Sequence, residues 1–145
     1  MRFLVTGGAG FIGSHITEEL LRKGHHVRVL DNFSTGKRDN LRFAADSPDI
    51  DIVEADIRDF ESVVRLADGV QGIFHQAALV SVPATIEQPR LSFEINARGT
   101  FNVLEAARQN KTGRVVYASS AAVYGDNDTL PLAETLPTRP VSPYG

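Results

Sequence analysis

Apolar residues form two kinds of pattern that alternate along the chain. Short, β-branched apolar runs predict strands at residues 2–6, 26–31, 50–55, 70–75 and 114–119. Between them, apolar residues at helical spacing predict helices at residues 11–22, 60–68 and 90–109, with a short helix around residues 39–45. Such alternation is typical of βαβ units. The sequence therefore predicts an α/β fold, a doubly wound parallel sheet with helices on both faces.

Composition limits the kind of protein this can be. A length of 145 residues with 42% hydrophobic residues suits one compact domain, which we expect over residues 1–145. The net charge of -3 gives no general attraction for nucleic acid or an anionic membrane, so neither is expected as a partner. The N-terminal apolar run is too short for a signal peptide or a membrane span. The absence of cysteine excludes disulfides and thiolate metal sites and favours a cytoplasmic location.

The first predicted strand is followed by the stretch GGAGFIG, in which Gly7, Gly10 and Gly13 recur at every third position. Glycines at these places allow a tight turn, let the backbone approach a pyrophosphate and let a helix pack close to the strand. The N terminus of that helix would add N–H donors and the positive end of its dipole. The bare pattern fits an ordinary strand-to-helix turn equally well, so the residues that follow must decide.

Two carboxylates stand where the next predicted strands end. Asp31 comes 18 residues after Gly13, where it can accept hydrogen bonds from adenosine ribose hydroxyls. It would repel a 2′-phosphate and so favours NAD over NADP, although the cations Lys37 and Arg38 lie nearby in the sequence. Asp56 could accept a hydrogen bond from the adenine amine, or it could begin a helix as its N-cap. The pattern predicts a Rossmann-type dinucleotide site.

Six stretches stand in order along the chain: TGGAGFIGSH, LDNFSTGKR, ADIRD, HQAA, SSAAVYG and SPYG. Together they resemble the extended short-chain dehydrogenase/reductase family, and within it the NAD-dependent nucleotide-sugar epimerases and dehydratases. The resemblance is greatest to the 4-epimerases of UDP-glucose and UDP-N-acetylglucosamine. It covers nearly all 145 residues. It implies NAD as the cofactor, a nucleotide sugar such as a UDP-sugar as the substrate, and a homodimer formed through the long helix and the helix of the tyrosine.

The resemblance implies cofactor contacts along these stretches. The pyrophosphate would be held by Gly7, Gly10, Phe11, Ile12 and Gly13, the adenosine ribose by Asp31, Asn32, Ser34 and Gly36, the adenine by Asp56 and Ile57, and the nicotinamide-side ribose and phosphates by Gln76, Ala77 and Ala78. Asn96 matches a family asparagine near the cofactor, and its other interpretation is a polar helix residue bonded to a neighbouring carbonyl. A lysine that often reaches the cofactor in 4-epimerases is replaced here by Val80.

The same resemblance implies that Ser120 and Tyr144 are catalytic and contact the sugar. The tyrosine phenolate, which also touches NAD, takes the proton of the sugar 4-hydroxyl while hydride leaves the same carbon for NAD, and the serine hydroxyl bridges the sugar oxygen. Family members place a lysine four residues after this tyrosine, beyond Gly145, and continue with further strands and a small sugar-binding domain. We therefore expect an incomplete Rossmann domain that binds NAD, epimerises poorly and exposes apolar surface.

The residues after Ser120 bear on the choice of reaction. Dehydratases of this family carry an Asp-Glu pair there, whereas this chain has Ala121 and Ala122, which cannot do acid or base chemistry. The sequence therefore favours a 4-epimerase over a 4,6-dehydratase. Two interpretations stay open: a reductase or decarboxylase of a related sugar, which net redox turnover of the nicotinamide cofactor would reveal, and a non-catalytic NAD-binding module, which would not need Ser120 and Tyr144.

Three further features carry weaker signals. Ser81 could touch the hexose, or it could cap a helix that starts at Val82. His75, flanked by apolar residues at a strand end, is interpreted as structural rather than as a base, and no histidine has metal-ligand spacing, so no metal site is expected. The proline-rich segment Gly125–Pro143 predicts a loop, which at that length is more often functional than idle.

Overall fold

A computed structural model describes all of residues 1–145 and contains one parallel sheet of five strands. The strands are β1 (Arg2–Thr6), β2 (His26–Asp31), β3 (Ile50–Glu54), β4 (Gly72–His75) and β5 (Arg114–Tyr117). Their order across the sheet is β3-β2-β1-β4-β5, and every neighbouring pair is parallel. The α/β fold with a parallel sheet is therefore confirmed, because consecutive strands are joined by crossovers that place helices on the faces.

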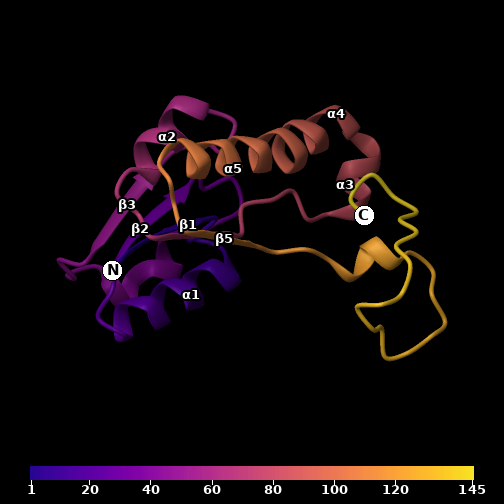
Figure 1. Ribbon diagram of the computed structural model, residues 1–145, viewed down its shortest axis with the longest axis horizontal. Helices are drawn as coiled ribbons and strands as arrows, with labels where there is room; N and C mark the ends of the chain where they lie inside the picture. Colours follow the sequence, from indigo (N-terminus) through magenta and orange to yellow (C-terminus); the bar gives the residue numbers. More distant parts are fainter.

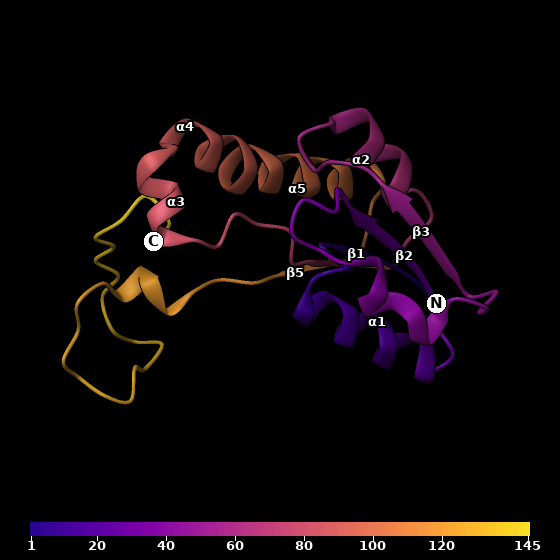
Figure 2. The ribbon, with the colours of Figure 1, turned by 180° about the vertical axis from the view of Figure 1, so that it is seen from behind.

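Helices cover both faces of this sheet, as Figures 1 and 2 show. The helix α1 (Phe11–Arg22) and the short 3-10 helix η1 (Arg38–Ala44) lie on one face, and α2 (Phe60–Ala67) and α5 (Gly99–Gln109) lie on the other. The small elements α3 (Val82–Glu87), α4 (Pro89–Ser92) and η3 (Ala121–Tyr124) lie beyond the sheet, with the segment after β5 (Figure 1). None of the helices is long and apolar enough to cross a membrane.

The hydrophobic core has two parts because successive side chains of a strand point to opposite faces. Leu4 of β1 belongs to a cluster under α2 and α5, together with Val63 and Val103. The next residue, Val5, belongs to a cluster under α1, with Leu20. Each layer seals one face of the sheet. The two clusters do not cover the carboxyl ends of the strands, where the residues can make polar contacts.

The long helix predicted over residues 90–109 is present but not uniform. It consists of α4, the π-helical segment η2 (Phe93–Arg98) and α5, which follow one another without a break. In η2 the amide of Gly99 donates to the carbonyl of Glu94, five residues earlier. The helix α3 was absent from the expected elements, although the N-cap interpretation of Ser81 implied a helix there. The predicted loop Gly125–Pro143 contains no helix or strand.

Candidate functional site

The main cavity lies at the carboxyl ends of the central strands and has a volume of about 480 Å³. The strand order changes direction between β1 and β4, and ligands of open parallel sheets bind at such a switch point. Segments after β1, β2, β3, β4 and β5 all contribute to its wall. The topology therefore gathers residues far apart in the sequence around one space.

Most residues predicted to contact a dinucleotide line this cavity. They are Gly7, Gly10, Phe11, Ile12, Gly13, Asp31, Asn32, Ser34, Gly36, Asp56, Ile57, Gln76, Ala77, Ala78 and Tyr144. The side chains of Asn96, Ser81 and Ser120 do not line it. The wall also contains residues that the sequence did not single out, among them Leu79, Ala118 and Ser119. The last two follow β5, so the shared edge of a parallel sheet was the signal that could have found them.

The segment of residues 7–13, called the glycine loop from here on, is packed too tightly for side chains at Gly7 and Gly13. Gly7 has a φ of +67°, and a Cβ on it would lie 2.6 Å from the amide nitrogen of Ala77. A Cβ on Gly13 would collide with the carbonyl group of Gly7. The helix α1 begins at Phe11, and no side chain caps its N terminus. This cradle therefore fits a pyrophosphate, because an uncapped helix end offers amide donors and a positive dipole to an anion.

Asp31 holds the glycine loop and the end of β2 together. Its carboxylate is 6% exposed and accepts hydrogen bonds from the amides of Ala9, at 2.9 Å, and Phe33, at 2.8 Å. A Cβ on Gly36 would lie 2.7 Å from one carboxylate oxygen, so the chain passes close to it there. A carboxylate has about four acceptor positions, and two of them stay available for hydroxyl donors. The negative charge itself stands at the cavity wall.

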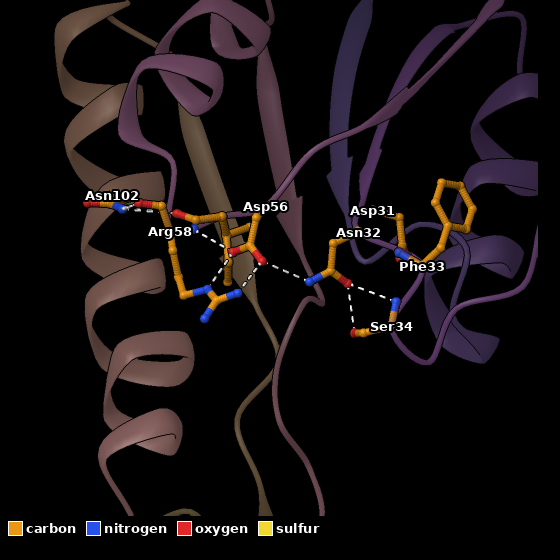
Figure 3. A network of polar contacts seen from close by, with 8 residues as sticks. Asp31, Asn32, Phe33, Ser34, Asp56, Arg58 and Asn102 are labelled. Atoms are coloured by element: carbon orange, nitrogen blue, oxygen red, sulfur yellow. Dashed lines mark hydrogen bonds and ion pairs between the residues drawn. The ribbon is translucent and has the colours of Figure 1, made fainter.

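Asn32, Ser34, Asp56 and Arg58 form a polar network along this wall (Figure 3). Asn32 donates to Asp56 at 2.9 Å, and its amide oxygen accepts from the hydroxyl of Ser34 at 2.7 Å. The Arg58 guanidinium donates to both oxygens of Asp56, at 2.9 and 2.7 Å. This pairing, more than any other contact, holds the pKa of Asp56 far below its usual range. Sequence reasoning missed Arg58, because a motif shows spacing and not which side chains pair.

The helix-capping interpretation of Asp56 is wrong. The N-cap of α2 is Asp59, whose carboxylate accepts from the amide of Ser62 at 3.3 Å. Asp56 instead accepts from the amide and the side chain of Arg58. Of the two cations that follow Asp31 in the sequence, Arg38 is engaged elsewhere: it pairs with Glu54, and its guanidinium carbon lies 4.1 Å from the ring centroid of Phe33.

Asn96 and Ser81 bond to the backbone instead of facing the cavity. The amide group of Asn96 accepts from the N–H of Leu79 at 2.8 Å and donates to the carbonyl of the same residue at 3.0 Å. The hydroxyl of Ser81 accepts from the amide of Ala84 at 3.3 Å and caps α3. Contacts of these two side chains with a cofactor or a hexose stay predictions.

His75 lies at the end of β4 and is 4% exposed. Its Nδ1 lies 2.6 Å from the hydroxyl of Thr6, and its Nε2 lies 2.9 Å from that of Thr100. Burial lowers the pKa of the imidazole to about 4. A neutral imidazole whose two nitrogens are both hydrogen-bonded agrees with the structural role expected from the sequence.

The predicted catalytic hydroxyls border adjoining spaces. Tyr144 lines the main cavity, whereas Ser120 lines a second, more open hollow of about 410 Å³. Ser119 borders both. The hydroxyl of Ser120 accepts from the amide of Ala122 at 3.2 Å, which starts the 3-10 turn η3. The catalytic roles of Ser120 and Tyr144 stay predictions, and Ser119 is the wall residue that the two spaces share.

Comparison with known proteins identifies the family. A profile of the NAD dependent epimerase/dehydratase family matches residues 3–145. The chain belongs to this family. It is 43% identical over 145 residues to a putative UDP-glucose 4-epimerase of Methanocaldococcus jannaschii, covering 98% of this chain and 46% of that one. The family expected from the six stretches is thus confirmed, and its description names the predicted cofactor, NAD.

Solved structures of the family agree with the fold. The UDP-glucose 4-epimerase of Thermus thermophilus in complex with NAD is 46% identical, with a TM-score of 0.89 over 99% of this chain and 46% of that one. A dTDP-glucose 4,6-dehydratase of Streptomyces venezuelae with NAD bound is 40% identical, with a TM-score of 0.93 over 99% of this chain and 47% of that one. The chain spans about half the length of the relatives that it matches.

Proposed function

We propose that this chain is the NAD-binding part of a nucleotide-sugar 4-epimerase that acts on a UDP-hexose or a UDP-N-acetylhexosamine. The observation that carries the proposal is the wall of the main cavity. It brings together the glycine loop, Asp31 at the end of β2, Asp56 after β3, and Tyr144, with Ser120 on the adjoining hollow. A module that only binds a dinucleotide has no need of Ser120, so a second hydroxyl on the adjoining hollow argues against a non-catalytic module.

The residues present fit NAD. Gly7, Gly10 and Gly13 leave room for the pyrophosphate at the start of α1. The buried carboxylate of Asp31 would accept from the adenosine ribose hydroxyls. The same charge would repel a 2′-phosphate, and the pairing of Arg38 with Glu54 leaves that cation engaged elsewhere. These features support NAD over NADP.

When bound, NAD would take a hydride from carbon 4 of the sugar and return it to the opposite face. Tyr144 would remove the proton of the sugar 4-hydroxyl and later return it, and Ser120 would hydrogen-bond the same oxygen. A proton transfer by a positioned side chain typically contributes about 10²–10⁴-fold to a rate. The apolar wall residues would limit the access of water to the reacting carbon.

Overall similarity does not choose between epimerase and dehydratase, because the chain is comparably similar to both. The choice rests on Ala121 and Ala122, which begin η3 directly after Ser120. A dehydratase must protonate the 6-hydroxyl leaving group and take a proton from carbon 5, and two methyl groups can do neither. This chemistry favours epimerisation.

The test is an assay of the whole protein with UDP-glucose and UDP-N-acetylglucosamine, followed by NMR of the sugar. We expect inversion at carbon 4, and Ser120→Ala should lower kcat by about a hundredfold. Ser47→Ala, in the loop before β3, is the matched control and should keep the wild-type rate. A 4-keto-6-deoxy product would contradict the proposal, as would net formation of NADH or an unchanged rate in Ser120→Ala.

A further inference from the structure

The buried imidazole of His75 has no part in the proposed reaction, yet both of its nitrogens are hydrogen-bonded. Its two partners come from distant parts of the chain. Thr6 is the last residue of β1, directly before the glycine loop, and Thr100 stands in the first turn of α5. The ring therefore bridges the centre of the sheet and the long helix.

The direction of each hydrogen bond follows from the carbonyl of Asn96, which can only accept a proton. The hydroxyl of Thr100 donates to the carbonyl of Asn96 at 2.6 Å, and this uses its only proton. The same oxygen must therefore accept from Nε2–H of His75, 2.9 Å away. In a neutral ring Nδ1 is then the acceptor, so Thr6 donates to it, and the oxygen of Thr6 accepts from the amide of Ala77 at 3.4 Å. The donor and the acceptor of each of these hydrogen bonds are therefore assigned.

The chain of bonds continues along the helix to the cavity wall. Asn96 and Thr100 lie four residues apart, and Asn96 belongs to the π-helical segment η2. While its carbonyl accepts from Thr100, its side-chain amide holds both backbone groups of Leu79. Single π-helical turns often occur at functional sites. Here Asn96 is linked to His75 through Thr100, which donates to its carbonyl, and to Leu79 directly through its side chain.

The two ends of this chain of bonds meet the same wall. Ala77 and Leu79 both line the main cavity, and Gly7, which follows Thr6, lies opposite Ala77. We propose that His75, as the neutral Nε2–H tautomer, is a positioning residue that fixes the segment Gln76–Leu79 between the glycine loop and η2 in the geometry that the dinucleotide requires. The inference rests on the proposed NAD binding. It adds Thr6, Thr100 and the carbonyl of Asn96 to the residues that support the site without touching it.

The first test compares three variants of the chain by calorimetric titration with NAD. Thr100→Val removes the acceptor of Nε2–H and leaves the carbonyl of Asn96 without its hydroxyl partner, and should weaken NAD binding about tenfold. Thr100→Ser keeps the hydroxyl and should restore the affinity. The control is Thr112→Val, because the hydroxyl of Thr112 is buried without a hydrogen-bond partner and does not line the cavity. It should bind NAD like the wild type.

The second test needs no ligand and so separates this inference from the proposed function. Nitrogen-15 NMR of the wild-type chain should show His75 protonated at Nε2 and accepting at Nδ1. The amide of Leu79 should exchange slowly with solvent, and faster in Thr100→Val than in Thr112→Val. A ring protonated at Nδ1, or unchanged exchange at Leu79, would overturn the inference even if NAD binds. Failure of the wild type to bind NAD, with the NMR result as expected, would instead overturn the proposed function.

Discussion

At the scale of the residue, His75 is an ionisable group whose pKa is shifted by folding in the direction that destabilises the fold at acidic pH. Its imidazole is held neutral because burial removes the water that would stabilise its charged form, which lowers its pKa to about 4. In the unfolded chain a histidine titrates near pH 6.5. Between these two values the unfolded chain binds a proton that the folded chain does not.

Stability should therefore fall as the pH decreases from about 6.5 towards about 4.5. The expected slope approaches about 1.4 kcal/mol per pH unit, because one proton is taken up on unfolding. The carboxylates with lowered pKa values, Glu19, Asp56 and Glu105, add a slope of the same sign only as the pH approaches the pKa of about 4 that they have in the unfolded chain, so the slope above about pH 5 reports His75. Urea unfolding at several pH values measures the slope, and His75→Gln should flatten it. A flat curve for the wild type would show that the ring takes up its proton in the folded chain as readily as in the unfolded chain.

At the scale of the element, the stability of α3 can show whether Ser81 caps a helix or contacts the hexose. The hydroxyl of Ser81 caps α3, and an aspartate can cap a helix equally well. If capping is its role, Ser81→Ala should cost about 1 kcal/mol of unfolding free energy, and Ser81→Asp should retain the stability. Chemical denaturation measures both. The affinity of the whole protein for UDP-sugar gives the other readout, and weaker binding by the stable Ser81→Asp variant would favour contact with the hexose.

The elements that periodicity could predict are those whose apolar side chains are buried. The strands and α1 follow directly, because Leu4 and Val5 point to opposite faces and Leu20 packs under α1. The same reasoning could not give the π-helical turn at Phe93–Arg98 or the short helix α3, where few residues are buried. Burial patterns carry no information about a shift in backbone hydrogen bonding.

Some features of the candidate site could likewise be predicted from the sequence, and others could not. The place of the glycines and carboxylates on the cavity wall could be predicted, since parallel strands end at the same edge of the sheet. The pairing of Arg58 with Asp56 and the bond from His75 to Thr100 could not, because each depends on side-chain geometry in the folded molecule. Asn96 lies between these cases: its motif pointed to the cofactor, and the structure places its amide on Leu79.

At the scale of the whole molecule, several large apolar side chains are exposed on the long helix and on the edge strand. Phe93 and Phe101 on the long helix are each 63% exposed, and Leu104 lies one helical turn after Phe101. On the edge strand β5, Val116 and Tyr117 are also exposed. Such patches on a helix commonly serve as contact surfaces between protein chains.

Self-association of the chain should therefore depend on the long helix. Phe101→Glu should shift the population towards monomer in sedimentation velocity, because a charge would be buried in the contact. Phe43→Glu is the matched control, since Phe43 is an exposed phenylalanine on η1, on the other face of the sheet. Equal effects of the two variants, or none, would show that association does not use the long helix.

We propose that the cavity at the carboxyl edge of the sheet binds NAD through the glycine loop and Asp31, and the proposed reaction depends on this binding. Calorimetric titration of the 145-residue chain with NAD and NADP tests it most directly. We expect saturable NAD binding, NADP binding at least about tenfold weaker, and a smaller difference in Asp31→Asn, because a 2′-phosphate would no longer meet a buried negative charge. Asp39→Asn, an exposed carboxylate on η1, should behave like the wild type. A folded chain that binds neither dinucleotide, or binds NADP as tightly as NAD, would contradict the account.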